Sequence, residues 1–312
     1  MLNHIIESQQ FTSEILFSLF KRADELRALK HGKCDDCLGG KILATLFYEP
    51  STRTRLSFES AMLRLGGTVV STENAKEFSS AIKGESLSDT IRIVCKYCDC
   101  IVLRHFETGA AFEASKVSSV PIINAGDGKG QHPTQALLDV YTLYREFGRL
   151  NNLKIAMVGD LASGRTVRSL CYLLAKFSGN KIIFVSPENL KMGEDIKEHL
   201  NKKGVEVSEE TDLNKILGEV DVVYMTRIQK ERISLEDYEK AKGKFVINSS
   251  NLSLINPDAR ILHPLPHVEE IDLSVEVEEN DKRIAYFRQA ENGLYIRMAL
   301  LDMILNKEGC FD

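Results

Sequence analysis

The most restrictive feature of this sequence is an alternation between short runs rich in Ile and Val and longer segments whose apolar residues recur with helical period. A strand covered by helices on both faces is apolar throughout, whereas an amphipathic helix has a single apolar stripe. The pattern therefore predicts an α/β fold of parallel sheets flanked by helices. The expected strands are 41–47, 68–71, 99–103, 121–124, 153–159, 181–186, 205–208, 220–226, 244–248 and 283–287.

Two domains are expected, because 312 residues with 43% hydrophobic content exceed what one core usually holds. The helical pattern of 132–147 stops at Gly148, a residue typical of helix C-termini, and a new strand follows at 153–159. A last helix over 289–305 is expected to pack back on the first domain. The predicted domains are 1–148, completed by 289–312, and 149–288.

Charge and the N-terminal residues bear on partners and location. Lys and Arg number 40 against 45 Asp and Glu, so a net charge of -5 gives no positive field for nucleic acid or membrane headgroups. The N-terminus lacks a basic start followed by an apolar run, and the longest apolar stretch contains charged residues. We therefore expect a cytoplasmic protein that binds neither nucleic acid nor membrane and holds any anion with a local cluster.

The cysteines are expected to be reduced. Their number, seven, is odd, and no secretory signal precedes them. The pairs Cys34/Cys37 and Cys95/Cys98 have zinc-site spacing, but neither is flanked by the short Gly turns of a zinc knuckle. The second pair lies in an apolar segment, where a free Cys behaves as a small hydrophobe. No metal site is predicted.

An anion site is predicted where the strand 41–47 runs through a turn into a helix expected at 56–65. Backbone N–H groups and the positive end of the helix dipole converge at such a turn. Hydroxyl groups and a planar guanidinium add further donors. The alternative is an ordinary capped helix start with solvated arginines. The donors in the turn are Ser51, Thr52, Arg53 and Thr54.

The whole of this turn, YEPSTRTRLSFE at 48–59, resembles the carbamoyl phosphate signature of the aspartate and ornithine carbamoyltransferases. Other segments agree in the same order, so the resemblance extends from about residue 11 to 305. These segments are Leu103-Arg104-His105, His132-Pro133-Thr134-Gln135, Gly164-Arg165-Thr166, 226–232 (TRIQKER) and His263-Pro264-Leu265-Pro266.

The resemblance implies a set of carbamoyl phosphate ligands. Phosphate would be held by Ser51, Thr52, Arg53, Thr54 and Arg104, and the carbamoyl oxygen by Thr54, Arg104 and His132. Gln135 matches the residue that holds the carbamoyl NH2. In family members, Ser79 and Lys83 reach the site of a neighbouring subunit, which implies a homotrimer with shared active sites.

The acceptor amine is expected to be L-aspartate, because a dicarboxylate needs two cationic forks beyond the phosphate ligands. By resemblance, Arg165 binds the α-carboxylate, while Arg227 and Gln229, assisted by Lys83, bind the side-chain carboxylate. Backbone carbonyls of Leu265 and Pro266 would hold the amino group. Ornithine or another amino acid is the alternative acceptor, but Pro264 stands where the ornithine enzymes have Cys. His267 departs from the Arg that usually follows HPLP.

The implied reaction is attack by the amine on the carbamoyl carbon with loss of phosphate, which needs no cofactor. Arg53, Thr54, Arg104 and His132 are the expected catalytic residues, with His132 a neutral donor to the carbonyl oxygen rather than a general base. A P-loop at 159–166 is disfavoured because Arg165 replaces the required Lys, and a dehydrogenase because GxGxxG is missing. A non-catalytic paralogue and a separate regulatory chain are left open.

Overall fold

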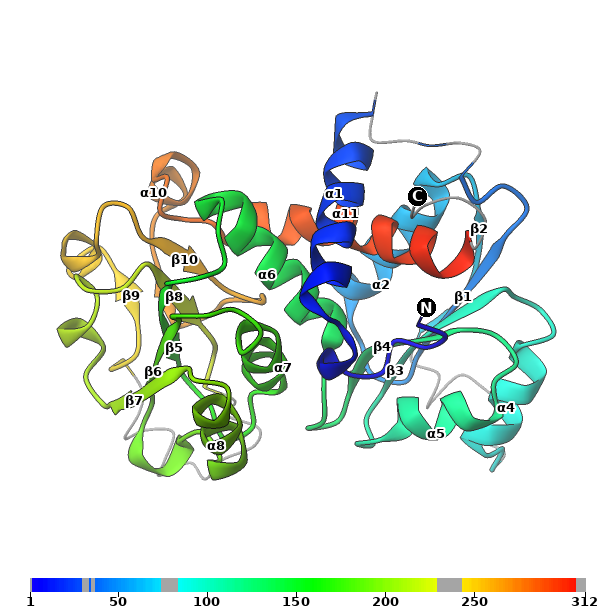
Figure 1. The fold of residues 1–312 in the computed structure, drawn as a ribbon, viewed down its shortest axis with the longest axis horizontal. Coiled ribbons are helices and arrows are strands. Elements are labelled where there is room, and N and C mark those ends of the chain that lie inside the picture. Colours follow the sequence, from blue (N-terminus) through cyan, green and yellow to red (C-terminus); the bar gives the residue numbers. More distant parts are fainter. Residues whose placement is uncertain (1, 30–33, 35–36, 74–83, 229–242, 307–312) are drawn as a thin grey trace. The chain divides into compact units, whose positions relative to one another are not determined.

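The computed structural model describes residues 2–29, 34, 37–73, 84–228 and 243–306 (Figure 1). The chain divides into two compact units, the first made of 1–141 with 291–312 and the second of 142–290. The divisions fall within α6 (Pro133–Phe147) and α11 (Tyr286–Leu305). The domain limits taken from the sequence, 148 and 288, stay predictions.

Unit 1 contains a four-stranded parallel sheet in the order β2-β1-β3-β4. Its strands are β1 (Ile42–Phe47), β2 (Thr68–Glu73), β3 (Cys100–His105) and β4 (Ile122–Asp127). Helix α2 packs on β1 and β2, and α5 packs on β3 and β4. The helices are α1 (Ser13–Ala28), α2 (Thr52–Arg64), α4 (Leu87–Val94), α5 (Ala110–Val117) and a 3-10 turn at Ser8–Gln10.

Helix α1 begins where the sequence offers a cap, because the Thr12 hydroxyl accepts a hydrogen bond from the Ile15 N–H at 3.3 Å. Its apolar stripe is buried in the core of the unit. The C-terminal helix α11 packs in the same unit, where Arg22 on α1 donates to the buried Asp302 at 2.7 Å. This confirms the predicted return of the C-terminal helix.

Unit 2 contains a five-stranded parallel sheet in the order β10-β8-β5-β6-β7, and a separate pair β11-β9. The strands are β5 (Lys154–Val158), β6 (Lys181–Val185), β7 (Glu206–Glu210), β8 (Val222–Met225), β9 (Ile247–Asn248), β10 (Arg260–Leu262) and β11 (Ile271–Asp272). The helices are α7 (Arg165–Leu174), α8 (Glu194–Lys202) and α10 (Val275–Asn280), with 3-10 turns at Glu188–Leu190, Leu213–Lys215 and Leu252–Leu254. The predicted α/β class is confirmed.

Each sheet has a point where the direction of strand addition reverses. In unit 1 the chain goes from β1 outward to β2 and then returns to β3 on the other side of β1. In unit 2 it goes from β5 outward through β6 and β7 and returns to β8 on the other side of β5. Loops after the two strands that flank such a point diverge, and ligands bind in the crevice between them.

Two local predictions were wrong. In the expected strand 283–287, Ile284 makes only an isolated bridge to Ile261, and α11 begins at Tyr286. The edge strand is instead β10, which is too short to give an alternation signal and lies between Pro257 and Pro264. The other error is at the phosphate turn, where α2 begins at Thr52 rather than residue 56.

The expectation of fully reduced cysteines was also wrong, because Cys34 and Cys37 form a disulfide with Cα atoms 5.5 Å apart. That separation lies within the range of about 4.4 to 6.8 Å that a disulfide requires. By contrast, Cys95, Cys98, Cys100 and Cys171 are free thiols. Of the second pair, Cys95 is buried as expected of a core residue, while Cys98 is half-buried. Among the described residues, no group of three His, Cys, Asp or Glu side chains could hold a metal ion.

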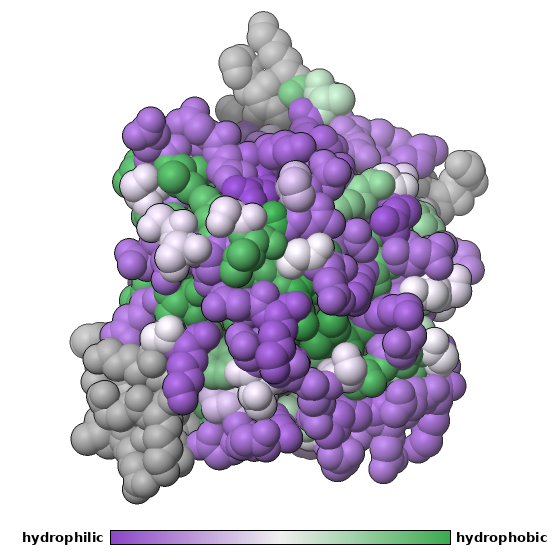
Figure 2. Space-filling view, turned by 90° about the vertical axis from the view of Figure 1, so that its left-hand side faces the viewer, coloured by the Kyte–Doolittle hydropathy of each residue, from purple (hydrophilic) through white to green (hydrophobic). Residues whose placement is uncertain are grey.

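The face drawn in Figure 2 is largely hydrophilic, with apolar side chains showing between polar ones. Apolar residues gather inside instead, for example in the unit 2 core around Val158, Val223 and Ile261. Within the described ranges, no helix is both long enough and apolar enough to cross a membrane.

Candidate functional site

The predicted anion site lies at the N-terminus of α2, directly after β1. The side chain of Ser51, the N-cap residue, makes no capping hydrogen bond within the described part of the chain. The first backbone bond runs from the Arg55 N–H to the Ser51 carbonyl at 3.0 Å. The N–H groups of Thr52, Arg53 and Thr54 precede that bond, so they have no intrahelical carbonyl and point out of the helix end. This is the geometry of an anion site.

Two arginines of this turn have different surroundings. Arg55 is paired with Glu73 at 2.7 Å and with Glu59 at 3.5 Å. Arg53 is exposed and has no ion pair with any residue that the structure describes. Partial desolvation nevertheless lowers the pKa of the Arg53 guanidinium. A bound anion would supply the missing countercharge, so Arg53 is the arginine of the turn suited to phosphate.

Arg104 reaches the same sheet edge from the neighbouring strand β3, where it pairs in register with Phe47 of β1. The Tyr48 N–H donates to the Arg104 carbonyl at 2.9 Å, which joins the two strand ends. The guanidinium lies 3.4 Å from Glu49 and donates to the Ala125 carbonyl at 3.2 Å. Arg104 and the turn Ser51–Thr54 therefore flank the switch point of unit 1.

His105, the next residue, was not expected in the site. Its Nδ1 accepts from the Glu107 N–H at 3.1 Å, and its ring lies against Tyr48 at 4.8 Å and Phe106 at 4.3 Å. Burial lowers the pKa of His105, although Glu107 and Glu49 oppose that effect. The ring therefore packs between aromatic side chains as a neutral group and is not an additional cation.

His132 and Gln135 lie at the start of α6, and both are buried. Asp127, at the end of β4, accepts from the Gln131 N–H at 2.8 Å and so holds the segment before α6 at this sheet edge. The Thr134 hydroxyl lies 3.4 Å from His132 Nδ1. These two contacts hold His132 near the end of β4.

The amide of Gln135 is oriented by Asp139, a residue that the sequence analysis did not single out. Gln135 Nε2 donates to Asp139 Oδ1 at 2.9 Å, and Asp139 is fully buried. An ionised carboxylate only accepts hydrogen bonds, so Gln135 must turn its NH2 toward Asp139 and its carbonyl oxygen away from it. An oxygen presented in this way is suited to accept from an NH2 group of a ligand.

Asp139 has a buried cation as its electrostatic partner. Burial lowers the pKa of Arg297 to about 10, and the charge of Asp139 opposes that effect. Arg297 also lies over the Phe58 ring, 5.2 Å from its centroid. The spacing of Gln135 and Asp139, one helical turn apart, was a signal for their contact, but Arg297 is too distant in the sequence to be linked with them.

In unit 2, Arg165 is the first residue of α7, after β5, and Arg227 follows β8. These strands are paired and flank the switch point of their sheet. Their ends are joined closely, because Thr226 donates to the Val158 carbonyl through both its N–H and its hydroxyl at 2.8 Å. Gly159, at φ 119°, allows this approach, since a Cβ there would lie 2.2 Å from the Thr226 carbonyl oxygen.

The segment with Leu265 and Pro266 follows β10, which pairs with β8 on the side away from β5. His263 Nδ1 accepts from the Leu265 N–H at 2.8 Å, and its Nε2 lies 2.9 Å from Glu270. Burial alone would raise the pKa of Glu270, but the hydrogen bonds from His263 and backbone N–H groups hold it below its usual value. The loop is thus fixed at both ends.

His267, in place of the expected Arg, tethers the same loop. Its Nε2 lies 3.2 Å from Glu278 of α10, which also accepts from the Tyr286 hydroxyl. The His267 ring packs edge-on against Tyr286 at 5.3 Å. An imidazole therefore reaches a carboxylate here without a guanidinium. Three other predicted site residues, Ser79, Lys83 and Gln229, lie outside the described residues.

Known proteins match the chain along nearly its whole length. The model of the aspartate/ornithine carbamoyltransferase carbamoyl-P binding domain matches residues 3–145, and that of the Asp/Orn binding domain matches 151–304. Aspartate carbamoyltransferase 3, chloroplastic, of Pisum sativum is 57% identical over 97% of this chain and 78% of its own length.

Two solved structures agree with these matches. The catalytic subunit of M. jannaschii aspartate transcarbamoylase has a TM-score of 0.90 and 46% identity, with 98% and 99% of the two chains covered. The Trypanosoma cruzi enzyme in complex with N-(phosphonacetyl)-L-aspartic acid has a TM-score of 0.90 and 39% identity, with 97% and 96% covered.

The comparisons correct one expectation and decide the family. The cytoplasmic location predicted from the N-terminus is contradicted by the Pisum sativum relative, which is named chloroplastic. The family models together match most of the chain, and the parallel sheets carry the signature residues at their switch points. The chain belongs to the aspartate/ornithine carbamoyltransferase family.

Proposed function

We propose that this protein transfers the carbamoyl group of carbamoyl phosphate to the amino group of L-aspartate, which gives N-carbamoyl-L-aspartate and phosphate in pyrimidine biosynthesis. One observation carries the proposal: each sheet presents cationic side chains at its switch point. One set suits a phosphate compound and the other suits a dicarboxylate. Unit 1 presents Arg53 and Arg104 beside a helix N-terminus, and unit 2 presents Arg165 and Arg227.

The carbamoyl phosphate half of the site would work by electrostatic stabilisation. Ser51, Thr52, Arg53 and Thr54 bind the phosphate, while Thr54, Arg104 and His132 donate to the carbamoyl oxygen, where negative charge grows during attack. A donor aimed at such an oxygen is worth about 3 to 4 kcal/mol. Gln135 accepts from the carbamoyl NH2, as the bond from its own NH2 to Asp139 favours.

The aspartate half would work by positioning. Arg165 binds the α-carboxylate and Arg227, with Gln229, binds the side-chain carboxylate, while the carbonyls of Leu265 and Pro266 hold the amino group. Fixing the amine beside the carbamoyl carbon contributes on the order of 7 to 11 kcal/mol, because a bimolecular step becomes effectively unimolecular. A general base, a metal or a nucleotide has no assigned role in this scheme.

The test is a carbamoyl transfer assay with no added metal or nucleotide, with aspartate and ornithine as competing acceptors. We expect carbamoyl-aspartate to form and Arg227→Ala to raise the KM for aspartate far more than the KM for carbamoyl phosphate, since Arg227 contacts one substrate only. Faster carbamoylation of ornithine would overturn the acceptor. Absence of either product from folded protein would favour the non-catalytic alternative.

The assembly forms a second part of the proposal. We infer a homotrimer in which Ser79 and Lys83 of one subunit complete the site of its neighbour, as the resemblance to the family implies. Lys83 would then assist both substrates. A separate regulatory chain is compatible with this arrangement, and co-purification from the native source would identify such a chain.

A further inference from the structure

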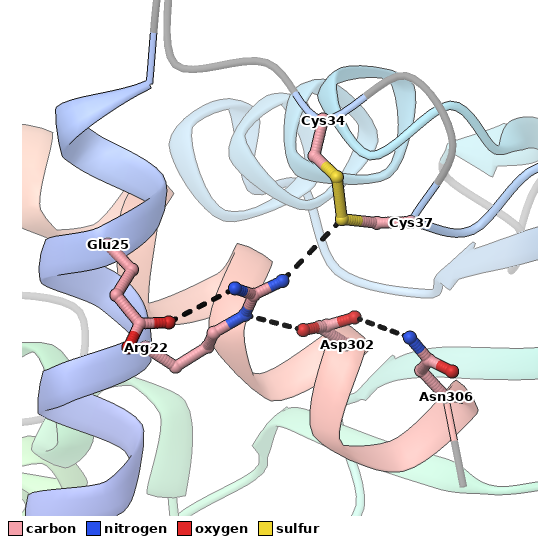
Figure 3. Close-up of a disulfide and its surroundings, with 6 residues drawn as sticks. All are labelled: Arg22, Glu25, Cys34, Cys37, Asp302 and Asn306. Atoms are coloured by element: carbon pink, nitrogen blue, oxygen red, sulfur yellow. Dashed lines mark hydrogen bonds and ion pairs between the residues drawn. A yellow bond between two sulfur atoms is a disulfide. The ribbon is translucent and has the colours of Figure 1, made fainter. Parts of the chain in front are cut away.

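The Cys34–Cys37 disulfide has surroundings that the proposed carbamoyl transfer does not use. Arg22 on α1 has partners on several sides: its Nε donates to Asp302 at 2.7 Å, its Nη1 to Glu25 at 3.1 Å, and its Nη2 to Cys37 Sγ at 3.5 Å (Figure 3). In this view Cys37 Sγ faces the guanidinium, and Cys34 Sγ lies on the far side of the S–S bond from it. The two sulfur atoms are therefore electrostatically unequal.

We propose that Cys34 and Cys37 form a thiol–disulfide exchange site whose substrate is a small or protein-borne dithiol, with Cys37 the leaving sulfur and Arg22 the group that stabilises its thiolate. A thiolate attacks the sulfur whose partner leaves most readily, and a neighbouring arginine favours the thiolate form of the sulfur that it contacts. The position of Arg22 makes Cys34 the sulfur that is attacked.

The exchange balances with one dithiol. A thiolate of the reductant attacks Cys34 Sγ, the S–S bond breaks, and the electron pair leaves on Cys37 Sγ beside Arg22. The second thiol of the reductant then attacks its own sulfur in the mixed disulfide, which releases Cys34. Two electrons and two protons pass from the dithiol, which becomes a disulfide, and the protein gains two thiols.

The backbone keeps the two cysteines close without the S–S bond. The Cys34 N–H donates to the Arg64 carbonyl at 2.8 Å, the Leu38 N–H to the Leu65 carbonyl at 2.7 Å, and the Cys37 N–H to the Cys34 carbonyl at 3.3 Å. These bonds tie both sides of the turn to the end of α2. The reduced thiols therefore stay within bonding reach, so the disulfide can form again.

Accessibility separates this pair from the other described cysteines. Cys34 and Cys37 are partly exposed, whereas Cys95, Cys100 and Cys171 are buried. Burial also raises the pKa of the half-buried Cys98 thiol to about 11, which keeps it protonated and unreactive at neutral pH. Exchange is therefore expected at the first pair and not at the others.

Among the described residues, Glu25 and Asp302 pair with Arg22, and Arg64 is a further charged residue beside the site, since its carbonyl accepts from the Cys34 N–H. Asp302 is fully buried on α11 and holds the inner side of the guanidinium, while Glu25 is about half exposed and competes with Cys37 for its outer side. Asp35 and Asp36, between the cysteines in the sequence, lie outside the described residues. Substitutions at Arg22 and Glu25 isolate the effect of the cation.

The first experiment counts thiols by alkylation and mass spectrometry in the folded full-length protein equilibrated with reduced and oxidised dithiothreitol. We expect two thiols to appear together in one two-electron transition, and Cys34→Ser or Cys37→Ser to abolish it. Cys171→Ser is the matched control and should leave the transition unchanged. A pair that stays oxidised until urea unfolds the protein, or that is never oxidised, overturns the proposal.

The second experiment measures alkylation of the single remaining thiol of the pair against pH. Cys37 in Cys34→Ser should react at lower pH than Cys34 in Cys37→Ser. Added to Cys34→Ser, Arg22→Gln should shift the Cys37 profile to higher pH, Arg22→Lys should largely restore it, and Glu25→Gln should shift it to lower pH. Glu25→Gln keeps the Arg22–Asp302 pair, so it serves if Arg22→Gln unfolds. Identical profiles for both cysteines, unmoved by Glu25→Gln, overturn the role of Arg22.

Discussion

Arg53 and Arg55 lie in the same helical turn but differ in what neutralises them. Arg55 is held by Glu59 and Glu73, whereas Arg53 has no ion pair among the described residues. We expect Arg53→Ala to lower the carbamoyl transfer rate by several orders of magnitude with little change in melting temperature, because it removes a proposed phosphate ligand and no ion pair among the described residues.

Arg92→Ala is the matched control for Arg53→Ala. Arg92 is an exposed arginine on α4 that lies 3.7 Å from Asp89, so its loss should leave the rate unchanged. Steady-state rates with both substrates saturating, together with thermal melts, provide the measurement. Near-full activity of Arg53→Ala would remove it from the phosphate site.

The orientation of Gln135 gives a second prediction at this scale. Asp139→Asn offers an NH2 to Gln135, which can then turn its own NH2 toward the substrate. We expect kcat to fall by about 10- to 100-fold through misplacement. The Gln135→Ala/Asp139→Asn double variant should be no slower than Gln135→Ala alone, because the two losses act through one group. Fully additive losses in the kinetic cycle would show that Asp139 acts elsewhere.

The sequence predicted the signature residues of the site but not the residues that orient them. The string around Ser51–Thr54 is local, so a single stretch identifies it. Arg297 lies far from Gln135 and Asp139 in the sequence. Its charge interacts with that of Asp139 because α11 packs in unit 1. His105 was missed because its role is packing, which residue type alone does not reveal.

At the scale of elements, the Glu146 carboxylate links α6, β10 and α11 in unit 2 through hydrogen bonds. On α6, it accepts from Arg260 of β10 at 2.6 Å and from Arg288 of α11 at 2.8 Å. Burial would raise the pKa of Glu146, but the two arginines hold it below its ordinary value of 4.5. Glu146→Gln should lower the free energy of unfolding by about 2 to 3 kcal/mol at neutral pH, as for the loss of charged hydrogen bonds.

The pH dependence of this loss follows from the lowered pKa. A depressed carboxyl pKa contributes stability that is complete above pH 4.5 and is lost as pH falls below it, since the carboxylate protonates. Urea midpoints of wild type and Glu146→Gln should therefore converge on acidification. Glu219→Gln, which removes an exposed pair with Lys154, is the control and should shift the midpoint little. A gap that persists unchanged into acid would contradict the assignment.

Elements with several consecutive apolar residues were predictable from the sequence, and short ones were not. Strands such as β1 and β6 combine Ile, Val and Leu in runs bounded by polar residues, so their signal is local. Strand β10 has three residues and is defined by its pairing with β8, which only the folded chain reveals. The same holds for the Cys34–Cys37 bond, because the backbone bonds from Cys34 and Leu38 to the end of α2 join residues far apart in the sequence.

At the scale of the whole molecule, the proposal that active sites are shared rests on Arg53 and Lys83 acting from different subunits. Pure Arg53→Ala trimers and pure Lys83→Ala trimers should both be nearly inactive, because every site in either lacks one group. If instead each subunit supplied both groups to its own site, mixing the two variants could not restore activity, since every subunit would still carry a defect.

Random reassembly of equal amounts of the two inactive variants separates these arrangements. In a closed ring, a site is intact only where one subunit supplies Arg53 and its neighbour supplies Lys83, which happens for about 1/2 × 1/2, or one quarter, of the sites. We therefore expect the reassembled mixture, whose hybrid trimers are verified by native mass spectrometry, to recover about one quarter of wild-type activity. Mock reassembly of each variant alone is the control and should recover none. Verified hybrids as inactive as their parents would place Lys83 in the site of its own subunit or outside the site.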